Sequence, residues 1–169
     1  HTHWKTVTEE RMMKSDRQCG SVFGGLSVQE IEEAFVRSFV LKPARERYLA
    51  LLNLKDGKGR RKFLEALDYK VVGELDSRYV QELRGITWFP KHVLPMLEEH
   101  GAGPTAFVTS GSDLDLQVLP LAEAVQRTVD ASIGTVVTCL PGQLALYGSE
   151  YERFLCHRVR CRGEVGSLL

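Results

Sequence analysis

Residues 135–140 are the stretch that most constrains what this chain can fold into. Their sequence, Thr-Val-Val-Thr-Cys-Leu, is apolar or β-branched at every position, with Gly134 before it and a Pro-Gly turn after it. A short run in which polar residues do not alternate with apolar ones is typical of a strand that is buried on both faces of a sheet. The sequence therefore predicts a strand in the interior of a covered sheet.

The stretches on either side of this run predict the rest of the sheet. Residues 105–109 are rich in β-branched and aromatic residues and predict a strand. Leu121, Val125 and Val129 recur at every fourth position and predict a helix between the two strands. Strands joined by a helical crossover are expected to run parallel, with a right-handed connection.

A hairpin is predicted at the carboxyl end of the sheet. Residues 144–147 and 153–159 flank a Gly-Ser-Glu turn, as in an antiparallel pair. The predicted order of elements is therefore β-α-β-β-β, in a small mixed sheet.

The amino-terminal half predicts about five short helices packed on this sheet, in an α+β or α/β fold. Ser27 and Glu30 form a capping box that begins the first helix. Further helices are predicted over 43–54, over 58–67, from Asp76, and over 90–100. We expect residues 27–169 to form a single α/β domain, with a helical part over 27–101 and a sheet part over 102–160.

Residues 1–26 are expected to be a flexible amino-terminal segment. The first 13 residues are polar, lack periodicity and do not begin with methionine, as in a vector-derived or upstream extension. Gly20, Gly24 and Gly25 then lie among polar neighbours, which is typical of a loop.

The net charge, the lengths of the apolar runs and the cysteines limit which classes of function are expected. The 169 residues carry no formal net charge, which argues against extended coating of nucleic acid. No apolar run approaches the roughly 18–20 residues of a membrane span, and no signal peptide is evident, so a cytoplasmic protein that does not bind membranes is expected. Cys19, Cys139, Cys156 and Cys161 do not form paired C-x-x-C motifs, so free thiols are expected.

Asp113 and Asp115 are the candidate catalytic residues. Two carboxylates one residue apart in an extended segment lie on the same side and can share a divalent cation. The pattern resembles the D-x-D strand of nucleotidyltransferases, which implies phosphate- or nucleotide-directed chemistry. That family has its Gly-Ser pair some ten residues upstream and a third acid on a later strand, whereas here Gly111 and Ser112 abut the acids and residues 134–140 contain none. The alternative is that both aspartates cap a turn after the strand.

Lys58, Arg60, Arg61 and Lys62 are the candidate anion- or nucleic-acid-binding residues. All four lie in the first turns of a predicted helix, where the helix dipole favours anions. Four cations at a helix start therefore oppose the dipole. A phosphate held there by backbone N–H groups and by these cations would explain their placement. The alternative is a solvated basic loop.

No metal site and no cofactor are predicted. Cys156, His157 and Cys161 lie close in sequence, but Cys156 and His157 are adjacent on a predicted strand and point to opposite faces. A zinc site needs three or four ligands that converge.

The carboxyl-terminal third contains three short patterns: S-x-S-x-L-D, then L-P-L-x-E-A, then C-L-P-G-x-L-A-x-Y. Their residues are Ser110, Ser112, Leu114, Asp115, Leu119, Pro120, Leu121, Glu123, Ala124, Cys139, Leu140, Pro141, Gly142, Leu144, Ala145 and Tyr147. This third of the chain resembles that of a group of bacterial proteins to which no activity is attached. The resemblance implies kinship and a bacterial origin but no chemistry.

The function expected from the sequence is that of a non-catalytic bacterial interaction or regulatory protein with a protein partner. Two alternatives stay open. One is an enzyme with its site near Asp113 and Asp115 at the strand ends. The other is weak nucleic-acid binding through the basic residues 58–62.

Overall fold

The computed structural model of the chain describes residues 20–158, and all that follows concerns these residues. They form a six-stranded sheet in the order β1-β6-β5-β4-β2-β3, in which every neighbouring pair is antiparallel. The strands are β1 (Val80–Glu82), β2 (Thr105–Ser110), β3 (Val118–Pro120), β4 (Thr135–Leu140), β5 (Leu144–Gly148) and β6 (Arg153–His157).

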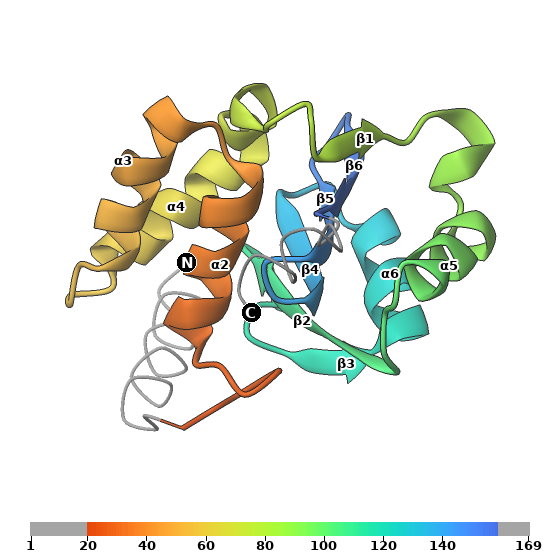
Figure 1. Cartoon of the computed structure of the whole chain (residues 1–169), viewed down its shortest axis with the longest axis horizontal. Coiled ribbons are helices and arrows are strands. Elements are labelled where there is room, and N and C mark those ends of the chain that lie inside the picture. Colours follow the sequence, from red (N-terminus) through yellow and green to blue (C-terminus); the bar gives the residue numbers. More distant parts are fainter. Residues whose placement is uncertain (1–19, 159–169) are drawn as a thin grey trace, which may run out of the picture.

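Helices cover the sheet on both faces (Figure 1). On one face lie α2 (Val28–Phe39), α3 (Lys42–Leu52) and α4 (Lys58–Tyr69), and on the other lie α5 (Pro90–Glu99) and α6 (Leu121–Asp130). Two short 3₁₀ helices, η1 (Val71–Glu74) and η2 (Gly85–Trp88), lie before and after β1. The protein therefore has mixed α+β architecture, with a sheet between two helical layers.

β4 confirms the prediction that residues 135–140 form a strand buried on both faces. Residues 135 to 139 are all buried, and the side chains alternate between the two hydrophobic cores. Val136 packs in the core beneath α2, α3 and α4, whereas Val137 packs in the core beneath α5 and α6. Residues 135–140 are apolar or β-branched at every position because a helical layer covers each face of β4.

The predicted parallel pairing of the strands at 105–109 and 135–140 is wrong. β2 and β4 are adjacent, but they run antiparallel, with Val108 opposite Val137. The reason is β3, a short strand that was not predicted from the sequence and that folds back against β2 before α6 begins. Both β3 and β4 run opposite to β2, so α6 crosses from β3 to β4 and not from β2.

The predicted arrangement of about five helices in the amino-terminal half needs correction. The helix expected from Asp76 is absent. Asp76 instead accepts hydrogen bonds from the backbone N–H of Arg78 at 3.1 Å and from its guanidinium, which closes a turn that leads into β1. The helices of residues 27–101 also do not form one bundle, because α5 packs on the opposite face from α2, α3 and α4.

Several local predictions are confirmed. The Ser27 side chain accepts from the Glu30 N–H, and the Glu30 carboxylate accepts from the Ser27 N–H, so the capping box begins α2 as expected. The predicted hairpin exists as β5 and β6, with Leu146 opposite Leu155. The helix predicted over 90–100 exists as α5, and Gly101 follows it in a left-handed conformation with φ of 102°.

Part of the segment predicted to be a flexible entry is described. In residues 20–26, the Val22 N–H bonds to the Leu26 carbonyl, and the Phe23 ring stacks on Phe107 of β2. The predictions for residues 1–19, including Cys19, and for Cys161 lie outside the described residues. Within 20–158, no helix combines the length and the apolarity that crossing a bilayer requires.

Gly134 provides a test of how α4 packs on the sheet. Its N–H bonds to a carboxylate oxygen of Asp68 at 2.7 Å, and a Cβ at this position would lie 2.3 Å from the Leu67 backbone. Gly134→Ala is expected to reduce the free energy of unfolding by about 1–3 kcal/mol, because α4 must shift away from β4. Chemical denaturation measures this loss. Gly103→Ala is the matched control, since a Cβ there meets no atom within 4 Å; equal losses in the two variants would contradict the packing.

Candidate functional site

A buried cluster of three charged side chains joins the helical layer to the sheet. Arg60 of α4 donates to Glu32 of α2 through Nε and Nη2, each at 2.9 Å. It also donates to Asp115, in the turn between β2 and β3, through Nη1 at 2.7 Å and Nη2 at 2.8 Å. All three residues are buried, with exposed fractions of 8% or less. We call these three residues the charged cluster.

The carboxylates of the charged cluster make further hydrogen bonds. Glu32 accepts from the Thr109 hydroxyl at 2.8 Å, and Asp115 accepts from the Ser110 N–H at 3.0 Å. Burial alone would lower the pKa of Arg60, but the two carboxylates outweigh that effect and hold the pKa above its ordinary value. Arg60 therefore keeps its charge, and the cluster orients α2, α4 and β2 relative to one another.

Local backbone structure explains how Arg60 and Asp115 meet. Gly57 precedes α4 in a left-handed conformation with φ of 73°, and the next glycine, Gly59, lies against the Leu51 carbonyl of α3. Asp115 is followed by Leu116, a non-glycine residue with φ of 63°. Such a conformation is uncommon for leucine and needs support from its surroundings, which here includes a hydrogen bond from the Leu116 N–H to the Val108 carbonyl at 2.8 Å.

The structure separates the two predicted acidic residues. Asp115 points into the protein and binds Arg60, whereas the Asp113 side chain is 79% exposed and lies 3.8 Å from Arg127 of α6. The two carboxylates therefore have different surroundings and do not face a common cleft.

The predicted basic residues are also divided. Lys58, Arg61 and Lys62 are exposed, whereas Arg60 is buried between two carboxylates. Arg60 was grouped with the others as an anion-binding candidate, but its charge is balanced inside the protein. Anion binding at this helix start would have to rest on the three exposed cations, and it stays a prediction.

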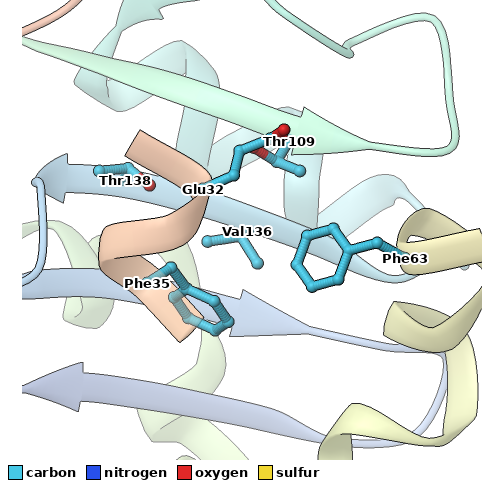
Figure 2. Close-up of a pocket in the computed structure, with 6 residues that line it drawn as sticks. All are labelled: Glu32, Phe35, Phe63, Thr109, Val136 and Thr138. Carbon is cyan, nitrogen blue, oxygen red and sulfur yellow. The ribbon is translucent and has the colours of Figure 1, made fainter. Parts of the chain in front are cut away.

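A small gap lies beside the charged cluster, between the helices and the sheet (Figure 2). Six residues line it, and all six are buried. They are Glu32 and Phe35 of α2, Phe63 of α4, Thr109 of β2, and Val136 and Thr138 of β4. The gap is too narrow to hold a water molecule, so it is a packing defect and not a ligand pocket.

The described cysteines do not have the properties of nucleophiles. Burial raises the pKa of Cys139 to about 12, and it raises the pKa of Cys156 as well. Both thiols are thus protonated at neutral pH, and the thiolate is the reactive form. Cys156 packs in the core beneath α2, α3 and α4.

His157 lies against His100, the residue that follows α5, with the two ring centroids 4.3 Å apart. Burial and the neighbouring His100 lower the pKa of His157 below its ordinary value of 6.5. Within residues 20–158, no three His, Cys, Asp or Glu side chains are placed to hold a metal ion together. The prediction that Cys156, His157 and Cys161 bind no metal stays untested, because Cys161 lies outside the described residues.

The connection between β1 and α5 presents large apolar side chains to solvent. Ile86 is 66% exposed and Phe89 is 50% exposed. Between them Trp88 is partly buried, with the Arg153 guanidinium 4.3 Å from its ring centroid. We call Ile86, Trp88 and Phe89 the η2 surface.

Positive charge borders the η2 surface. Arg84 precedes it with a side chain that is 80% exposed and bonds to Glu82 at 2.6 Å. Lys91 follows it, exposed, in the first turn of α5. That turn contains no acidic residue and has no side-chain cap, so the positive end of the helix dipole is not compensated within the helix.

Comparison with known proteins assigns no family. No family model, no curated protein and no solved structure matches the chain. The resemblance of residues 112–116 to nucleotidyltransferases therefore stays a prediction, and the candidate site depends on the described side chains.

Glu32 and the η2 surface were not predicted from the sequence. Glu32 lies three positions before Phe35 and four before Val36, a spacing that places it on the buried face of α2, and this was the available signal. Ile86 and the aromatic pair after it lie in a connector without helical or strand periodicity, which gives no indication of which side chains are exposed.

Arg60→Ala tests the charged cluster. The change leaves Glu32 and Asp115 buried without their cation, so we expect the free energy of unfolding to fall by about 3–5 kcal/mol. Urea denaturation followed by circular dichroism measures the loss. Lys62→Ala removes an exposed cation from the same helix and should change stability by less than about 0.5 kcal/mol. Similar losses in both variants would show that the buried contacts of Arg60 do not contribute to the free energy of unfolding.

His157 provides a prediction of pH dependence. Because its pKa is lower in the folded protein than in the unfolded chain, the unfolded chain binds more protons below about pH 6.5. Stability from this group is present above that pH and is lost as the pH falls through the folded pKa. His157→Gln should therefore flatten the dependence of unfolding free energy on pH between about 7.5 and 5.5.

The matched control for this measurement is His92→Gln, which changes an exposed histidine of α5 and keeps the contact between His100 and His157. It should leave most of the pH dependence in place. A wild-type profile that is flat over this range would contradict the prediction.

Proposed function

We propose that this protein is a non-catalytic interaction protein that binds a segment of another protein through the η2 surface. The observation that carries the proposal is the exposure of Ile86 and Phe89, at 66% and 50%, three positions apart on one short connection. Large apolar side chains that gather on a surface are typical of binding sites, whereas single scattered ones are not.

The composition of the η2 surface suits recognition of a protein. Aromatic residues and arginine are enriched at the centres of protein interfaces, where a few of them carry most of the binding energy. Trp88 is already held by Arg153, which in turn donates to the Glu152 carbonyl at 3.0 Å. A side chain ordered before binding loses less conformational entropy when the partner arrives.

Acidic side chains are the favoured complement in the partner. Arg84 and Lys91 border the apolar residues, and the first turn of α5 lacks an acid of its own. A carboxylate of the partner near that turn would be stabilised by the helix dipole and by Lys91, and a second one by Arg84. The partner segment is therefore apolar and acidic.

The placement of the ionisable residues supports binding over catalysis. Asp115 and Arg60 are occupied with each other and with Glu32, and Asp113 is exposed beside Arg127. An enzyme near Asp113 and Asp115 would need groups that converge on a substrate. Nucleic-acid binding through Lys58, Arg61 and Lys62 stays an alternative.

Peptide selection tests the proposal. Peptides selected from a displayed library of random dodecapeptides on the full chain should bind Ile86→Asp/Phe89→Asp at least tenfold more weakly than wild type. The physical reason is the loss of apolar contact area and the introduction of acids opposite an acidic ligand. Fluorescence polarisation with labelled peptides measures the affinities.

Leu54→Asp is the matched control, because Leu54 is an apolar residue that is 53% exposed between α3 and α4. It should bind the peptides as wild type does. Equal binding by the double variant, or a selection that yields no binding peptide, would exclude the η2 surface as the site.

A further inference from the structure

β1 forms one edge of the sheet, and two of its three residues direct their backbone hydrogen-bonding groups away from β6. The His157 N–H donates to the Tyr79 carbonyl, and the Leu83 N–H donates to the Arg153 carbonyl, both within 2.9 Å. Alternation along an antiparallel pair then turns Gln81 toward β6 as well. The N–H and C=O groups of Val80 and Glu82 therefore point outward along the edge.

The two edges of the sheet differ in how well they are protected against the addition of another strand. β3, the opposite edge, ends in Pro120, which has no N–H to offer, and α6 begins at the next residue. β1 contains no proline, and Gln81 and Glu82 are exposed. The charge of Glu82, which would discourage an added strand, is matched by Arg84 at 2.6 Å.

The edge of β1 leads directly to the η2 surface. Leu83 and Arg84 join the two, and Arg84 is itself extended, with φ of −125° and ψ of 151°. A segment paired with β1 in the antiparallel direction would therefore come from the side of Ile86 and Phe89 and continue along Glu82 and Val80. Backbone pairing and apolar contact would be made by one continuous segment.

Arginines at both ends of the edge indicate the charge of the occupant. The Arg78 side chain, before β1, is 73% exposed, and the Arg84 side chain, after it, is 80% exposed. Each already contacts one carboxylate, but a guanidinium has five N–H donors and can bind another. Arg158 adds a third cation, stacked 4.6 Å from the Tyr79 ring centroid. A second copy of this chain would bring the same cations to the edge, whereas an acidic segment complements them.

We propose that the partner is an extended acidic segment of another protein that adds to the sheet as a seventh strand beside β1. The outward groups of Val80 and Glu82 supply the backbone hydrogen bonds, and the arginines select for carboxylates. This inference rests on the proposed function, because it specifies how the partner of the η2 surface binds.

Glu82→Pro tests strand addition, with Glu82→Ala as its matched control. Proline at this position removes an outward N–H and leaves the pairing with β6 intact, whereas alanine removes the same carboxylate and keeps the N–H. Dodecapeptides selected on the wild-type chain are labelled and titrated against both variants by fluorescence polarisation. We expect binding to Glu82→Pro to be at least tenfold weaker than binding to Glu82→Ala, and the selected peptides to be rich in Asp and Glu.

A second measurement does not depend on how the proline variant folds. Methylation of the peptide's backbone amides one at a time should weaken binding to the wild-type chain at every second position, because only alternate amides face β1. Methylation without that alternation would overturn strand addition, as would equal binding to Glu82→Pro and Glu82→Ala.

The outcomes also separate this inference from the proposed function. If Ile86→Asp/Phe89→Asp abolishes binding and Glu82→Pro does not, the η2 surface is the site and strand addition is wrong. If neither variant weakens binding, both proposals fail. Self-association of the wild-type chain in analytical ultracentrifugation that Glu82→Pro prevents would make a second copy the occupant and overturn the choice of an acidic partner.

Discussion

The arrangement of the helices on the sheet depends on the buried contacts of Arg60 with Glu32 and Asp115. These three residues come from α2, α4 and the turn after β2, which are distant in sequence. Removing two carboxylates and a guanidinium from water is costly, and the attraction between them offsets that cost only when the geometry is close to ideal. The cluster therefore specifies how the elements align more than it adds net stability. A misplaced α4 would leave charge buried without a partner.

The sheet in turn separates two hydrophobic cores. Successive residues of β4 point alternately into the core beneath α2, α3 and α4 and into the core beneath α5 and α6. The central strands are consequently apolar at almost every position, as strands in parallel sheets are, although this sheet is antiparallel throughout. Burial on two faces produces that composition, whatever the direction of the neighbouring strand.

The charged cluster and the proposed binding surface lie in different parts of the molecule. The charged cluster lies between α2, α4 and β2, whereas the edge of β1 and the η2 surface lie where the chain passes from one helical layer to the other (Figure 1). Ile86 and Phe89 are exposed, so variants at the η2 surface leave the contacts of the charged cluster in place. This separation makes the proposed binding experiments interpretable.

Features that depend on near neighbours in the chain were predictable from the sequence. The capping box of α2 joins residues three positions apart, and the β5–β6 hairpin joins strands across a short turn. The direction of β2 relative to β4 was not predictable, because it depends on the three-residue strand β3, which is too short to show a periodicity. Arg60 and Asp115 were each singled out, but as parts of two separate sites. Only the tertiary structure joins them, across 55 positions, because no local pattern records which distant charge will share a buried site.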